Sequence, residues 1–281
     1  MQSMRHPSKF VLFAAALALA AAPAFAGIHY KSVTHMEGGP QSRTAAGDMK
    51  GDTKVEGWAA GDKARIEFRE SANPMMKTGM FMITKDGGKT MYMVNPEDKT
   101  YVEWDLKAML GTAGAVMNGM GALVKMDFST PKIEKLAEED GGTLLGLPTR
   151  HVRYRTSYTL TVKVLGMGNS SDVVSEQDIW TTQKLSDIAL GAWLRADPPQ
   201  TGNEQLDKLI ASGREKIQGI PLKMITVSTN TDKKKGRTTV TRMTMEVTEI
   251  NASTAVPPSS FEIPAGYKQT EMMMPARQGR Q

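Results

Sequence analysis

The stretch MFMITKDGGKTMYMV, residues 80–94, places four methionines on the two sides of one tight turn: Met80, Met82, Met91 and Met93. Asp-Gly at 86–87 is a favoured two-residue hairpin turn. Because side chains alternate along a strand, this turn puts all four on one face, and a Gly-Gly turn at 87–88 changes their partners but keeps them together. A three-residue loop would divide them two and two and set Lys85 opposite Lys89, an unfavourable like-charge pair. We therefore predict a four-methionine face.

The second face of this hairpin is also apolar, with Phe81, Ile83, Tyr92 and Val94. An antiparallel hairpin with one wet face would alternate apolar and polar residues instead. We therefore expect other parts of the chain to cover the hairpin on both sides.

Most of the remaining chain has the two-residue alternation of β-strands. It is clear in ARIEFRE (64–70), in HVRYRTSYTLTVKVL (151–165) and in TTVTRMTMEVTEI (238–250), where Met243 and Met245 share a side. The strands are separated by short turn signals such as NPEDK. Short connections predict antiparallel pairing of neighbouring strands.

Three segments predict helices. Residues 108–124 are uncharged and contain four glycines; because each glycine inside a helix costs about 1 kcal/mol, we expect a soft helix that covers an apolar surface. Residues 186–199 and 203–217 predict two more helices, the last with an apolar stripe.

The N-terminus has the form of a secretory signal peptide. Arg5 and Lys9 precede an apolar run, and a small-residue site ends at Ala26. We predict a signal peptide at 1–26, one domain at 27–268 and a loose tail at 269–281, with export to a bacterial periplasm. No cysteine is present, so stability must come from an ordinary core.

The charge is mild. The formal net charge of +5 includes Arg5 and Lys9, which leaves 5 − 2 = +3 for the mature chain. This value does not indicate a nucleic-acid partner.

Between about Ile28 and Lys268 the order of strands and turns resembles the periplasmic lipoprotein-carrier (LolA-like) superfamily and, more closely, uncharacterised exported families near it. The resemblance is carried by GWAAGDKARIEF, MITKDGGKTMYMVNPEDKTYVEW, GLPTRHVRYR, DIWTTQKL, GIPLKM and FEIPAGYK, in that order. It implies an α+β fold: a curved, open antiparallel half-barrel sheet with a few helices packed on its concave side. It also implies a space between sheet and helices that holds acyl chains or another amphiphile.

Methionine suits such a space because its unbranched, polarizable side chain adapts to ligands of varied shape. The predicted ligand-binding wall consists of Met80, Met82, Met91, Met93, Trp104, Met117, Met243 and Met245. Binding would remove the apolar surface of a lipid or other amphiphile from water, at about 25 cal/mol per Å², while the glycine-rich helix moves aside as a lid. This mechanism requires no metal and no cofactor.

Two alternatives use the same residues differently. Thioethers favour soft Cu(I), and EMMMP at 271–275 adds three more methionines. Alternatively, the apolar faces make a solid core and the surface carries a structural or interaction role. In that case DKKKGR at 232–237 is a basic hairpin tip that fits anionic headgroups at a membrane surface or an envelope protein.

Enzyme signatures are missing from the sequence. After the signal peptide the only histidines are His29, His35 and His151, and there is no HExxH motif, no GxSxG motif and no cysteine. We therefore expect a non-enzymatic protein.

Overall fold

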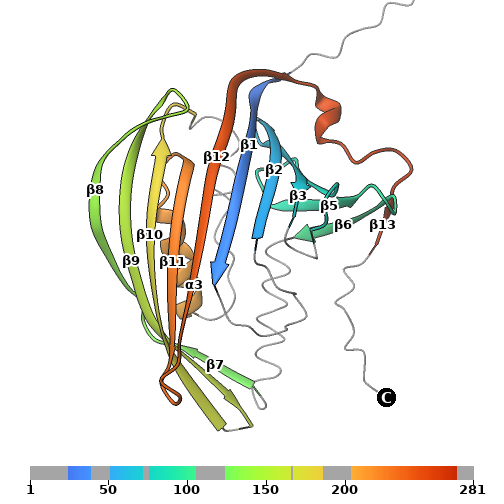
Figure 1. Ribbon diagram of the computed structural model, residues 1–281. Helices are drawn as coiled ribbons and strands as arrows, with labels where there is room; N and C mark the ends of the chain where they lie inside the picture. Colours follow the sequence, from blue (N-terminus) through green and yellow to red (C-terminus); the bar gives the residue numbers. More distant parts are fainter. Residues whose placement is uncertain are drawn as a thin grey trace, which may run out of the picture.

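The fold is one large β-sheet. The computed structural model describes residues 25–38, 51–71, 76–105, 124–165, 167–185 and 204–270. In these residues the sheet has thirteen strands in the order β13-β6-β5-β4-β3-β2-β1-β12-β11-β10-β9-β7, with β8 paired to β9 (Figure 1). Every pair is antiparallel except β13 with β6.

The strands are β1 (Phe25–Gly38), β2 (Gly51–Ala60), β3 (Lys63–Glu70), β4 (Phe81–Thr84), β5 (Thr90–Asn95), β6 (Thr100–Asp105), β7 (Val124–Phe128), β8 (Lys132–Leu144), β9 (Leu147–Val164), β10 (Met167–Thr182), β11 (Ile220–Asp232), β12 (Thr238–Val256) and β13 (Lys268–Gln269). The helical elements are α3 (Glu204–Glu215) and the short 3₁₀ helix η2 (Pro258–Phe261). The predicted strands at 64–70, 151–165 and 238–250 fall on β3, β9 and β12, and the predicted helix at 203–217 falls on α3.

The expected α+β class is wrong. The described chain is mostly strand, and α3 is its single α-helix. The described fold is therefore not a sheet with several helices packed on its concave side. The reason is the length of the strands: β9 has 18 residues and β12 has 19. Strands this long curve in the sheet, and the sheet then supplies both walls of its own interior (Figure 1). No helix within the described residues is long and apolar enough to cross a membrane.

Several predicted segments lie outside the described residues. They are positions 1–24 of the predicted signal peptide, 108–123 of the glycine-rich segment, the helix at 186–199, and the tail from position 271. Strand β13 ends at Gln269, the first residue of the predicted tail.

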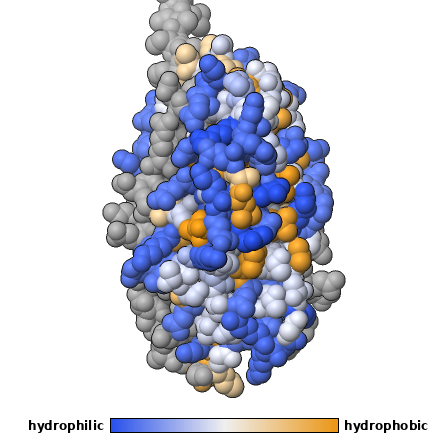
Figure 2. Space-filling view, turned by 90° about the vertical axis from the view of Figure 1, so that its left-hand side faces the viewer, coloured by the Kyte–Doolittle hydropathy of each residue, from blue (hydrophilic) through white to orange (hydrophobic). Residues whose placement is uncertain are grey.

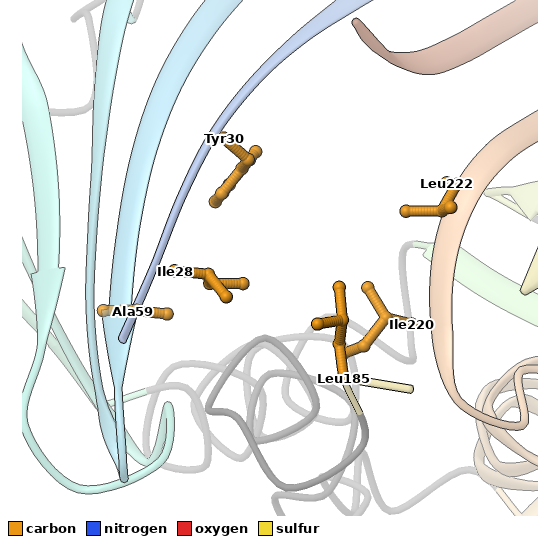
Figure 3. Close-up of a cluster of buried hydrophobic side chains, with 7 residues drawn as sticks. Ile28, Tyr30, Ala59, Leu185, Ile220 and Leu222 are labelled. Carbon is orange, nitrogen blue, oxygen red and sulfur yellow. The ribbon is translucent and has the colours of Figure 1, made fainter. Parts of the chain in front are cut away.

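The interior of the curve holds a buried apolar cluster: Ile28, Tyr30, Ala59, Ala64, Leu185, Ile220 and Leu222. Its members come from β1, β2 and β3 on one wall, and from β11 and the segment just after β10 on the other. Figure 3 shows the side chains of β1 and β2 pointing toward those of β11. Leu144 and Leu147 of the β8–β9 hairpin pack against the same cluster. The concave face is therefore continuous from one half of the sheet to the other.

The outer face of the other half is covered by the C-terminal segment. After β12, η2 places the fully buried Phe261 in a cluster with Phe81, Ile83 and Val94. Arg65 stabilises this cover, because its guanidinium lies 3.7 Å from the Phe81 ring centre and donates a hydrogen bond of 3.2 Å to the carbonyl of Ser260. The cover predicted for this face of the hairpin is thus the segment that follows β12.

Candidate ligand-binding face

The four methionines of the 80–94 hairpin share one face, as predicted. Met82 pairs with Met93 across β4 and β5. Both are buried, and they form a cluster with Phe68 against which Met80, Met91 and Met76 pack. The structure thus brings together all four predicted side chains and adds a fifth methionine.

The turn explains why the register is that of the Gly-Gly alternative. The Asp86 carboxylate accepts hydrogen bonds from the Thr84 hydroxyl at 3.0 Å and from the Thr90 amide at 3.0 and 3.1 Å. The amide of Gly88 donates to the Thr84 hydroxyl at 2.8 Å. These bonds hold a bend over residues 85–89, and the hairpin then closes around Gly87 and Gly88.

The methionine cluster belongs to the concave face. Val55 packs both against this cluster and against the interior cluster of Ile28 and Tyr30. Directly paired residues of neighbouring strands project from the same face. Such pairs continue across five strands: Met82 with Ile66, Phe68 with Val55, Val55 with Ser32, and Ser32 with Val247.

Met243 and Met245 lie on this same face, because they precede Val247 on β12 at steps of two residues. Met243 pairs with Met36 of β1, and Met245 pairs with Met224 of β11. All four side chains are partly buried. A second methionine group therefore continues the face of the first.

The two remaining predicted wall residues are Trp104 and Met117. The backbone of Trp104 pairs with Met91 in the β5–β6 register, and Met117 lies outside the described residues. Sequence reasoning missed Met36, Met76 and Met224. Met36 could have been predicted, because an even number of positions separates it from Ile28 and Tyr30 along β1, so its side chain projects from the same face.

The histidines lie on the opposite face, paired with carboxylates. His29 Nε2 lies 2.7 Å from Glu56, and the His151 ring nitrogens lie 2.9 Å from Glu139 and 2.8 Å from Asp178. His35 bonds to Asp52, and this hydrogen bond raises the pKa of His35. Within the described ranges no three His, Asp or Glu side chains converge as a metal site. Among the described residues, the soft donors on the concave face are the methionine sulfurs.

Comparison with known proteins gives one partial match. Residues 167–267 match a domain family of unknown function, DUF4412. This span contains β10, α3, β11, β12 and η2, with Met224, Met243 and Met245, but not the methionine hairpin. A search of curated proteins finds no match.

Proposed function

We propose that this protein is an exported, non-enzymatic binder of a lipid or another amphiphile, which it holds on its concave face in the periplasm. The observation that carries the proposal is one mainly apolar face with methionines on five strands of the sheet: β1, β4, β5, β11 and β12. Methionines spread over one face suit a ligand whose chain length and shape vary.

Burial of an acyl chain supplies the binding free energy in this proposal. Each methylene removed from water contributes about 0.8 kcal/mol. Shortening the chain by two methylenes should therefore weaken binding roughly tenfold, since 1.4 kcal/mol is a factor of ten in affinity. Affinities measured for a series of saturated chains test this slope, and affinities independent of chain length would contradict burial along the face.

Native mass spectrometry of protein purified gently from the periplasm, with and without added Cu(I), tests the proposed function directly. We expect a co-purifying mass of lipid size that extraction identifies. Stoichiometric copper without lipid would instead support a methionine copper site, and neither adduct would support a protein with a solid core and a surface role.

Two variants separate these outcomes. Replacing all four hairpin methionines by leucine keeps the apolar volume, because Leu and Met exchange at small cost; lipid should be retained, whereas Cu(I) should be lost. The half-buried Met80 and Met91 allow a polar counterpart, Met80→Gln with Met91→Gln, which should lower lipid retention at least about tenfold. Full retention of lipid by this folded double variant would contradict the assignment of the hairpin to the ligand wall.

A further inference from the structure

Lys216 is a buried cation on the concave side of the sheet. It directly follows α3 and is only 6% exposed. Its Nζ donates hydrogen bonds to Thr156 Oγ1 at 2.6 Å and to Gln177 Oε1 at 3.3 Å, and it lies 5.7 Å from the centre of the Tyr154 ring. All of these partners are neutral, and burial lowers the pKa of the Lys216 amine. A buried ammonium with neutral partners alone has not recovered the solvation that it lost.

The surroundings of Lys216 carry an excess of positive charge. A small recess with a volume of about 20 Å³ is lined by Lys135, Glu138, Arg150, Val152, Tyr154, Thr181, Lys216 and Gln218. Glu138 is its single acidic residue and already pairs with both Lys135 and Arg150. The volume corresponds to one water-sized group. The recess therefore suits one oxygen atom of an anion.

A polar atom on the strand next to Gln177 is also without a partner. Thr226 pairs with Gln177 in the β10–β11 register, and Gln177 accepts a hydrogen bond from Lys216. The Thr226 hydroxyl is buried and has no hydrogen-bond partner in the described part of the chain. On its other side Thr226 pairs with Met243, where the methionine face begins. At this position a buried hydroxyl group without a partner therefore lies next to the apolar methionine face.

We infer that Lys216 binds an oxygen of the anionic headgroup of an amphiphile, a carboxylate or a phosphate, whose tail lies on the methionine face. This inference rests on the proposed function and adds the charge class of its ligand. The headgroup supplies the counter-ion that Lys216 lacks, and Thr226 supplies a second donor.

The test compares three probes with the same twelve-carbon chain: laurate, dodecyl phosphate and the neutral dodecanol. Lys216→Met should lower the affinity for laurate or dodecyl phosphate at least about tenfold, because a buried charge-assisted bond is lost, and should leave dodecanol binding unchanged. The probe with the larger loss identifies the headgroup. Lys208→Met, which removes an exposed lysine of α3, is the matched control and should change none of the three affinities.

The possible outcomes distinguish the proposed headgroup site from the proposed amphiphile binding on which it rests. Equal losses for anionic and neutral probes, or equal wild-type affinities for all three, would overturn the headgroup site while amphiphile binding stands. Absence of all binding to the wild type would overturn the proposed function itself. If Lys216→Met does not fold, Arg150→Gln at the half-exposed rim is the second variant, expected to weaken anionic probes selectively by a few fold.

A second and independent observation lies at one end of the sheet. The β9–β10 hairpin tip exposes Leu165 at 66% and Met167 at 76%. The β11–β12 turn lies beside it, because the Lys233 amide donates to the Ser170 carbonyl at 2.9 Å. Figure 1 shows both tips at the lower end of the molecule, and Figure 2 shows hydrophobic residues at that end.

The neighbouring turn is basic. Lys234, Lys235 and Arg237 are exposed and form no ion pair in the described part of the chain, whereas Lys233 pairs with Asp172. The Asp232 carboxylate is occupied by the backbone amides of Lys234 and Lys235. Exposed apolar side chains beside cations that lack a counter-ion are the combination that attaches proteins to an anionic lipid surface.

We propose that these two hairpin tips dock the protein on an anionic lipid surface, with Leu165 and Met167 entering the headgroup layer. Co-sedimentation with phosphatidylglycerol vesicles should exceed that with phosphatidylcholine vesicles several fold and should fall with salt. Leu165→Ser with Met167→Ser, and separately Lys234→Gln with Lys235→Gln, should each lower it at least about threefold. Val240→Ser, at a half-exposed position of β12, is the control; equal binding to both vesicles, or variants that bind like the control, would overturn the docking site.

Discussion

Replacing Phe261 by alanine is expected to lower the free energy of unfolding by about 3–5 kcal/mol, the range for a fully buried phenylalanine. Phe261 is 0% exposed and ends η2, where it packs with Phe81, Ile83 and Val94 on the outer face of the sheet. Its truncation leaves a cavity and also loosens the segment that keeps this face of the methionine hairpin away from water. Urea unfolding measures the loss.

The control for this prediction is Val240→Ala. Val240 is 50% exposed on β12, and a surface truncation of this kind should stay within about 0.5 kcal/mol of the wild type. A Phe261→Ala protein as stable as this control would mean that the C-terminal segment does not hold the outer face. The hairpin would then need another cover.

The hairpin shows how much of the fold its sequence could predict. Alternation alone placed Met82 and Met93 on one face and required cover on the other, and the structure has both features. The partner of each methionine was harder to predict, because the register depends on where Asp86 and Thr84 place their hydrogen bonds in the turn. Those bonds are local, but the alternation of side chains does not show which of the three possible turns they select.

The fold class could not be predicted in the same way. Periodicity identifies a strand but does not show how far a sheet of long strands curves, and curvature decides whether helices are needed to close the interior. Strand β12 lies between β1 and β11 in the sheet, and the curve of the sheet at this point sets Ile220 and Leu222 opposite Ile28 and Tyr30. The resemblance that implied several helices on the concave side therefore predicted the open sheet but not the way its interior is built.

The candidate site also has one part that the sequence predicts and one part that it does not. The shared face of the methionines could be predicted from their spacing in the sequence, whereas the burial of Lys216 could not. A lysine at the end of a predicted helix ordinarily interacts with the helix dipole at the surface. Its burial depends on Thr156 and Gln177, which are distant in sequence and meet Lys216 because the sheet curves around α3. A candidate binding residue that is defined by such tertiary contacts leaves no local pattern in the sequence.

Gly57→Ala is expected to destabilise the protein by about 3 kcal/mol, at the upper end of what overpacking costs in a core. A Cβ at Gly57 would lie 2.2 Å from two ring carbons of Tyr30 and 2.5 Å from its hydroxyl oxygen. Tyr30 is 6% exposed, and its burial raises the pKa of its hydroxyl. The ring therefore has no free space to move into without disturbing the interior cluster. Thermal unfolding of the variant measures the cost.

A double-mutant cycle shows whether the Tyr30 ring is the cause. In a Tyr30→Ala background the added methyl group has nothing to strike, so the cost of Gly57→Ala should fall by at least about 2 kcal/mol, a coupling within the range for residues in contact. Gly213→Ala is the matched control: its Cβ would meet nothing within 4 Å, and alanine in a helix is favoured by about 1 kcal/mol, so this change should stabilise. An unchanged Gly57→Ala cost without the ring would contradict the steric origin. Because Tyr30 faces the concave interior, the clash also predicts that Gly57→Ala weakens dodecanol and laurate alike, unlike Lys216→Met.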